Sequence, residues 1–181
     1  MKNLIIGTIG GAFILFIWQF ISWGLVNFHY SSNSYLENQD DIYEMLKGKI
    51  EPGEYFLPTL PKGSAPEEME ALQAKAAGQP WIQIKYHESF NMNMGMNLFR
   101  GFTVDLLAAF LMMWILMKIP GVSMGESIMA CVAVGLIGYL TIPYLDSVWF
   151  ENTTLAYLID SIVPWVLCGG LFGWLIGRSR N

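Results

Sequence analysis

Four long apolar blocks constrain the fold of this chain more than any other feature of its sequence. The first runs from Leu4 to Val26 without a formal charge, which is long enough to cross a hydrocarbon core about 30 Å thick. Three further blocks follow over about 101–119, 127–142 and 155–177. Each block is bounded by polar residues or proline, so the chain is expected to cross a bilayer four times.

The predicted fold class is an all-α membrane protein, a bundle of four transmembrane helices with a small α+β extracytoplasmic cap. The third block is short, so its helix should extend back to about Met124 and stop at Pro143, which lacks a backbone donor. The predicted divisions are helix 1 over 1–28, the cap over 29–100, helix 2 over 101–119, helix 3 over 124–143, helix 4 over 155–177 and a cytoplasmic tail over 178–181.

Composition excludes several other classes of protein. Residues of the AVILMFWYC set make up 54% and charged residues 14% of the chain, against roughly a quarter charged in a typical globular protein. That balance excludes a disordered chain and an ordinary cytosolic domain. The net charge of −5 offers no basic surface, so no nucleic-acid partner is expected. The first block exceeds the roughly 7–15 residues of a signal-peptide core, which indicates a retained anchor.

Basic residues near the ends of the blocks predict the orientation. Lys2, Lys118, Arg178 and Arg180 fall on one side if the N terminus is inside, whereas the loop 144–154 carries no Lys or Arg. The positive-inside rule then puts both termini in the cytoplasm. The long segment between the first two helices is then expected on the outer side of the membrane.

The cap is the one polar segment large enough to fold. It carries ten acidic and six basic residues, a net charge of −4. A first helix is expected after the capping side chains of 38–41, and Ser64 and Glu67 have capping-box spacing for a second. Short strands are expected at 55–57 and 81–86. At about 70 residues, the cap is expected to depend on the membrane or a partner for stability.

Four short motifs resemble a known group of proteins. They are FIWQFISW at 16–23, EPGEYFLP at 51–58, DLLAA at 105–109, and a late loop carrying WF at 149–150 that leads into LID at 158–160. Together they are similar to a widespread uncharacterised family of bacterial inner-membrane proteins with four transmembrane helices and an exported loop domain between helices 1 and 2. The resemblance implies this architecture and location, and it carries over no catalytic residue.

One polar residue from each predicted helix falls at a similar depth. At a rise of about 1.5 Å per residue, Gln19, Asp105, Thr141 and Asp160 lie in one layer in the outer leaflet, with Arg100 just above it. Aspartates facing lipid are costly, so both should point into the bundle or a wet cavity. This layer is either a ligand or ion site, or a structural network in which Arg100 neutralises one aspartate and Gln19 bonds the other.

Small residues spaced by four predict the faces along which helices pack. Such residues let backbones approach closely, either within one bundle or between protomers. The predicted packing residues are Gly7 and Gly11 in helix 1, Ser127, Cys131 and Gly135 in helix 3, and Gly169, Gly173 and Gly177 in helix 4. Cys131 and Cys168 fit as packing residues, and no disulfide between them is expected.

Signatures of enzymatic chemistry are absent from the sequence. His29 and His87 are too far apart to suggest a zinc site, and no GxSxG or phosphate-binding loop occurs. We therefore expect no metal and no cofactor. The expected function is a non-catalytic accessory or scaffolding component, in contact with the lipid bilayer and with a membrane protein partner or a second copy of itself. The alternatives are a component that binds or transports a small solute, ion or lipid, and an enzyme that uses Asp105 and Asp160 on a lipid-borne substrate.

Overall fold

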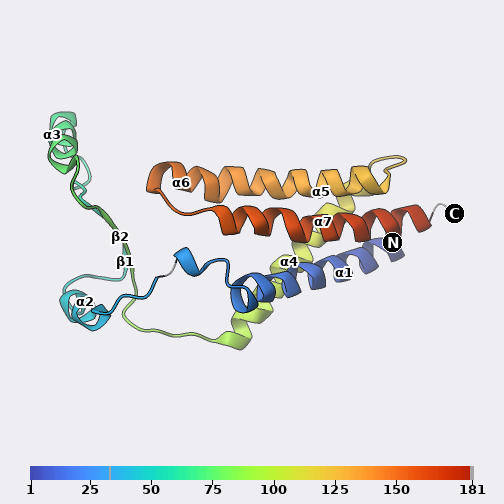
Figure 1. Ribbon diagram of the computed structural model, residues 1–181, viewed down its shortest axis with the longest axis horizontal. Helices are drawn as coiled ribbons and strands as arrows, with labels where there is room; N and C mark the ends of the chain where they lie inside the picture. Colours follow the sequence, from blue (N-terminus) through green and yellow to red (C-terminus); the bar gives the residue numbers. More distant parts are fainter. Residues whose placement is uncertain (33, 180–181) are drawn as a thin grey trace. The chain divides into compact units, whose positions relative to one another are not determined.

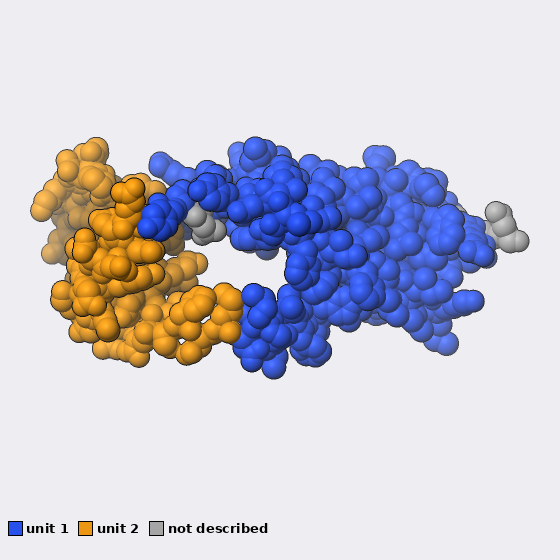
Figure 2. Space-filling model, turned by 60° about the horizontal axis from the view of Figure 1, so that its bottom comes forward, with its two compact units in different colours: residues 1–35, 93–181 blue, residues 36–92 orange. Residues whose placement is uncertain are grey.

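The computed structural model describes residues 1–32 and 34–179. Within them the chain divides into two compact units, which Figure 2 shows in different colours. Unit 1 comprises Met1–Tyr35 and Asn93–Asn181, and unit 2 comprises Leu36–Met92. Unit 2 thus corresponds to the central part of the predicted cap, and the rest of the chain is predominantly helical (Figure 1).

Unit 1 contains four helices that are long and apolar enough to cross a membrane, which matches the number of apolar blocks. Helix α1, Lys2–Gln19, continues as a π-helix over Phe20–Leu25. The other three are α4 (Met94–Leu116), α5 (Met124–Tyr139) with its continuation, and α7 (Leu155–Arg178). Tail residues 180–181, including Arg180, lie outside the described residues.

The third helix does not stop at Pro143, so that boundary was predicted wrongly. After α5 the chain forms a π-helix over Leu140–Tyr144, and α6, Leu145–Phe150, prolongs the same rod (Figure 1). The wider i→i+5 hydrogen bonding of a π-turn accommodates a residue that lacks an N–H group. The rod ends at Glu151, whose φ of 52° is left-handed.

The second helix also begins earlier than the predicted 101. The Asn93 side chain caps it by accepting a hydrogen bond from the Met96 backbone N–H at 3.0 Å, and helix α4 starts at Met94. Uncharged residues N-terminal to the apolar block therefore belong to the helix. As a consequence, Arg100 lies on α4 rather than in a loop.

The helices of unit 1 pack in the order α5, α7, α1, α4. Helix α7 lies between α5 and α1, and α1 packs on its other side against α4, whereas α4 touches α5 and α7 only over short stretches. The four helices thus form a row more than a closed ring. Their buried apolar core is drawn from α1, α4, α5, α7 and the turn before α5, and includes Ala12, Ala109, Met112, Met113, Leu116, Val122, Cys131, Cys168 and Phe172.

Close approach between helices depends on glycines of the predicted seams. A Cβ at Gly11 would lie 2.7 Å from the Phe172 ring, and one at Gly169 would lie 2.6 Å from the Ile128 backbone. Gly7 and Gly173 are similarly crowded by Met113 and Met124, and Gly135 faces the Ser161 carbonyl and Trp165. On the same seam, Ser127 donates to the Gly169 carbonyl at 2.9 Å and Cys131 is fully buried.

Gly177 differs from the other seam residues. A Cβ there would meet nothing within 4 Å, so this glycine takes no part in packing between the described helices. It lies in the last turn of α7, beyond the part of the helix that α5 covers closely at Gly169 and Gly173. Spacing by four identified the correct helix face but not where the contact ends.

Unit 2 is a β-ribbon flanked by two short helices. It comprises α2 (Gln39–Leu46), β1 (Gly53–Leu57), α3 (Pro66–Ala76) and β2 (Ile82–Tyr86). The strands are antiparallel, and the register pairs Gly53 with Tyr86 and Leu57 with Ile82. None of the residues 36–92 is buried.

The predicted capping box of α3 was out of register by one residue. The Ala65 backbone N–H donates to Glu68 Oε2 at 3.0 Å, and the Ser64 hydroxyl donates instead to the Pro61 carbonyl. Both pairs have the i, i+3 spacing of a capping box. Both candidate pairs have a glutamate as partner, so Pro66, directly after Ala65 in the first turn, favours Ala65 as the N-cap.

The substitution Gly135→Ala should destabilise the contact between α5 and α7. The added Cβ would collide with backbone at Ser161, which cannot swing aside, so the free energy of unfolding should fall by about 1–3 kcal/mol. Denaturant titration of the detergent-solubilised protein measures this. Gly138→Ala on the same helix is the matched control, since nothing lies within 4 Å of its Cβ. Equal stability of the two variants would contradict the packing assignment.

Candidate functional site: two aspartates held by helix α1

Asp160, near the start of α7, is the most extensively hydrogen-bonded side chain of unit 1. Its Oδ1 accepts hydrogen bonds from Trp18 Nε1 at 2.9 Å and from the Ser22 hydroxyl at 2.6 Å. Its Oδ2 lies 2.8 Å from His29 Nε2. Both carboxyl oxygens are therefore engaged, and all three partners come from α1 or the segment directly after it.

His29 reaches Asp160 because the chain folds back after helix 1. The π-helix over Phe20–Leu25 and a left-handed residue, Asn27 with φ of 53°, turn the backbone. The imidazole then stacks on Trp23 with ring centroids 3.7 Å apart, and meets the edge of Tyr157 at 4.9 Å. It is only 1% exposed. A histidine that follows the first apolar block thus becomes part of the helical core.

Asp105 on α4 is bonded by the neighbouring residue of helix 1. Gln19 Nε2 donates to Asp105 Oδ1 at 2.8 Å. The aspartate is 4% exposed, and its Oδ2 is buried without a hydrogen-bond partner in the described part of the chain. Because Trp18 and Gln19 are adjacent on α1, one short stretch of that helix bonds a carboxyl group on each of its two neighbours.

The structure does not gather the five polar residues singled out in the sequence into one site. Gln19 contacts Asp105, and Asp160 belongs to a separate set with other partners. Arg100 is exposed on α4, and no ion pair joins it to either aspartate among residues 1–32 and 34–179. The exposed Thr141 hydroxyl donates to the Ile137 carbonyl of its own helix at 2.7 Å.

Sequence reasoning missed Trp18, Ser22 and His29 as partners of Asp160. Trp18 and Ser22 are spaced by four and therefore share a helical face, a signal that could have paired them with a buried acid on another helix. No local sequence pattern predicts the π-helical turn that brings His29 next to Asp160. Depth in the membrane alone favoured Arg100 as a partner of the aspartates, but Arg100 lies on a different face of α4 from Asp105.

Ser22, His29 and Asp160 are the residue types of a hydrolase triad, but their connectivity differs from one. In a triad the histidine bridges the serine and the aspartate so that it can take the serine proton. Here Asp160 bridges the other two, and Ser22 is completely buried. The arrangement suits a structural clasp between α1 and α7 and gives Ser22 no access to a substrate.

Candidate metal ligands and thiols form no further constellation. Among the described residues no three His, Cys, Asp or Glu side chains are placed to hold a metal ion together. Cys131 and Cys168 are unpaired and buried in the helical core. The polar chemistry of unit 1 therefore centres on Asp105 and Asp160.

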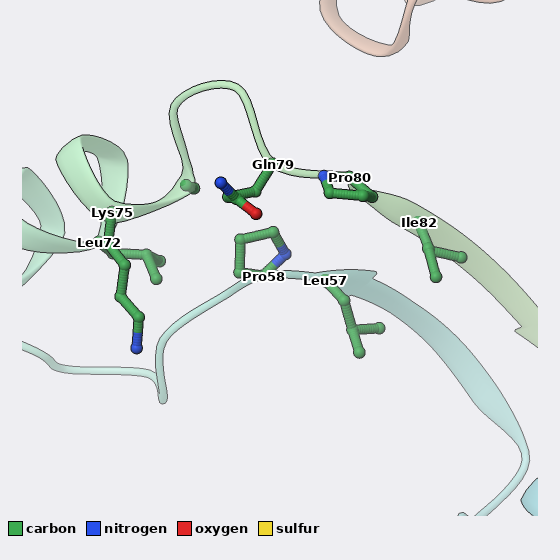
Figure 3. A pocket seen from close by; sticks show the side chains of 8 residues that line it. Leu57, Pro58, Leu72, Lys75, Gln79, Pro80 and Ile82 are labelled. Carbon is green, nitrogen blue, oxygen red and sulfur yellow. The ribbon is translucent and has the colours of Figure 1, made fainter.

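A shallow groove of about 410 Å³ lies in unit 2 between α3 and the β-ribbon. Figure 3 shows Leu72 and Lys75 of α3 at one end and Leu57 and Ile82 of the strands at the other. The complete lining is Leu57, Pro58, Leu72, Lys75, Ala76, Gln79, Pro80 and Ile82. Its chemistry is that of a contact surface for apolar side chains, with Lys75 as the charged member.

Comparison of the sequence with protein-family models, with curated proteins and with solved structures finds no match. The geometry of the site is therefore the basis for its proposed function.

Asp160→Asn should loosen the outer end of α1 from α7. The amide offers one acceptor oxygen instead of two, so at least one of the donors from the partly buried Trp18 and the buried Ser22 and His29 loses its acceptor, at about 1–3 kcal/mol. The measurement is again the free energy of unfolding in detergent. Asp146→Asn serves as control, because Asp146 is exposed and bonds only Asn152 among the described residues. A loss no larger than that of the control would contradict the clasp.

Proposed function

We propose that this chain is a multi-pass protein of the bacterial inner membrane, with both termini in the cytoplasm and unit 2 outside it. Four helices of sufficient length and apolarity support the four crossings. Asn3 Nδ2 donates to the Leu175 carbonyl at 2.9 Å, so the start of α1 lies beside the end of α7. The basic residues Lys2 and Arg178 therefore share one end of the helices, as the positive-inside rule requires.

Aromatic residues next to the basic ones support this end of the helices as a boundary between lipid and water. Lys118 lies 5.5 Å from the Trp114 ring and Arg178 lies 5.4 Å from the Trp174 ring. Tryptophan and basic side chains together are typical of the interface between lipid and water. Such pairs at the ends of α4 and α7 would hold both helices at a fixed depth.

The function we propose is that of a non-catalytic accessory or scaffolding component whose exported unit 2 binds a partner protein. The observation that carries it is that no residue of unit 2 is buried. Ordering each residue costs about 1–2 kcal/mol in backbone entropy, and burial of apolar surface is the main term that offsets it. Unit 2 exposes the required apolar side chains, including Leu57, Trp81 and Ile82, without covering them itself.

Charge favours a different protein over a second copy of unit 2 as that partner. Residues 36–92 contain ten acidic residues and five lysines, a net charge of −5. Two such units, or one unit and an anionic lipid surface, would repel each other. A partner with apolar side chains and a neutral or basic surface fits better.

The alternative function, binding or transport of a solute, ion or lipid by Gln19, Asp105, Thr141 and Asp160, has weaker support. Thr141 bonds its own helix, and Asp160 has both oxygens engaged by Trp18, Ser22 and His29. The same engagement argues against Asp160 as half of a catalytic carboxylate pair. Asp105 is the member of this layer with an open oxygen.

Cysteine labelling in intact cells tests the orientation. Lys62→Cys in unit 2 should react with a membrane-impermeant maleimide, whereas Ser179→Cys should react only after the cells are permeabilised. The unsubstituted chain is the control, because Cys131 and Cys168 are buried and should stay unlabelled. Labelling of both variants from the same side would exclude the proposed topology.

Site-specific photo-crosslinking tests the partner. A photoreactive amino acid at Ile82, in the groove and 54% exposed, should give one discrete crosslinked species in native membranes. The same amino acid at Glu70, exposed on α3 outside the groove, should not. Two differently tagged copies of the chain reveal whether the species is a homodimer. A homodimer, or equal crosslinking from both positions, would refute a distinct partner at this groove.

A further inference from the structure

The two aspartates of unit 1 differ in how their carboxyl groups are satisfied. Asp160 uses both oxygens in three hydrogen bonds. Asp105 accepts a bond from Gln19 at Oδ1, while its Oδ2 is buried without a hydrogen-bond partner in the described residues. Since Asp105 is 4% exposed, bulk water reaches little of the side chain.

The groups around Asp105 provide no compensating charge. Helix α1 presents the neutral amide of Gln19. On α4 itself, Arg100 is exposed, and no ion pair between described residues involves Asp105. Its nearest buried neighbours along α4, Ala109 and Met112, are apolar.

Asp105 Oδ2 is distinct from the other orphaned atoms of the core. Thr8 Oγ1 and His29 Nδ1 are also buried without a partner. A hydroxyl and an imidazole can be neutral, so each forgoes only a hydrogen bond, whereas an ionised carboxyl also carries an uncompensated charge. Because a buried unpaired charge is far more costly than a buried unpaired dipole, the expected partner of Oδ2 is positive.

We propose that Asp105 Oδ2 binds a small monovalent cation, either a proton or an alkali metal ion, where α4 packs against α1. Gln19 fixes the orientation of the carboxyl group through Oδ1 and leaves Oδ2 as the binding atom. A proton taken up from solvent forms an O–H bond at Oδ2 and removes the charge, whereas an alkali ion pairs with the carboxylate. The site does not involve unit 2, so it goes beyond the proposed partner-binding function.

Isotope-edited infrared spectroscopy tests this on the full chain in lipid nanodiscs, with the aspartate side-chain carboxyls labelled with carbon-13. Near neutral pH, in choline chloride, a bound proton gives the carbonyl stretch of a protonated carboxyl. That band should be lost completely in Asp105→Asn and kept in Asp160→Asn. A proton site retains the band when sodium, potassium or lithium replaces choline. An alkali-ion site instead shows a shifted Asp105 carboxylate band with one of these ions.

The labelled Asp160→Asn variant decides the matter even if Asp105→Asn fails to fold. Asp40, Asp41 and Asp146 are exposed and Asp160 is partly exposed, so in Asp160→Asn the one aspartate of the described residues that is withdrawn from solvent is Asp105. An Asp105 carboxylate band near neutral pH that none of the three alkali ions shifts would overturn the proposal. Loss of the protonated band in Asp160→Asn instead of Asp105→Asn would overturn it equally.

Discussion

The arrangement of unit 1 depends on one short stretch of helix 1 that bonds a buried carboxyl group, that of Asp105, on one neighbour and a partly buried one, that of Asp160, on the other. Trp18 and Ser22 donate to Asp160 on α7, and Gln19 donates to Asp105 on α4. In an apolar environment these acids have few other donors, so leaving one unbonded is costly. The requirement places α1 between α4 and α7 and sets its rotation about its own axis.

Small residues are the second feature that holds the helices of unit 1 together, in addition to the hydrogen bonds of the carboxyl groups. Apolar helices in lipid gain little from the hydrophobic effect, so their association depends on close van der Waals contact and on hydrogen bonds. Gly11 admits Phe172 from α7, and Gly169 admits the backbone of α5. The polar clasp gives the pairing its register, and the glycine seams bring the backbones together along the rest of each helix.

The sequence predicted the elements better than their ends or their tertiary contacts. Apolar length was sufficient to locate the long helices, and two-residue alternation and turn residues located the two strands of unit 2. They failed at Pro143, because a π-turn can absorb a proline, and at Ser64, because capping spacing recurs one residue later at Ala65. Depth along a helix grouped Thr141 and Arg100 with the aspartates, but depth carries no information about the direction in which a side chain points.

His29 is buried in the segment that leads from helix 1 to unit 2, which begins at Leu36. Its ring is fixed by Trp23, Tyr157 and Asp160. A force that pulls on unit 2 would therefore act on the contacts of His29 with α7 before it acts on the backbone hydrogen bonds of α1. The force would be divided between the ends of α1 and α7 that lie nearest to His29. Helix α1 would then be less prone to unwind from that end.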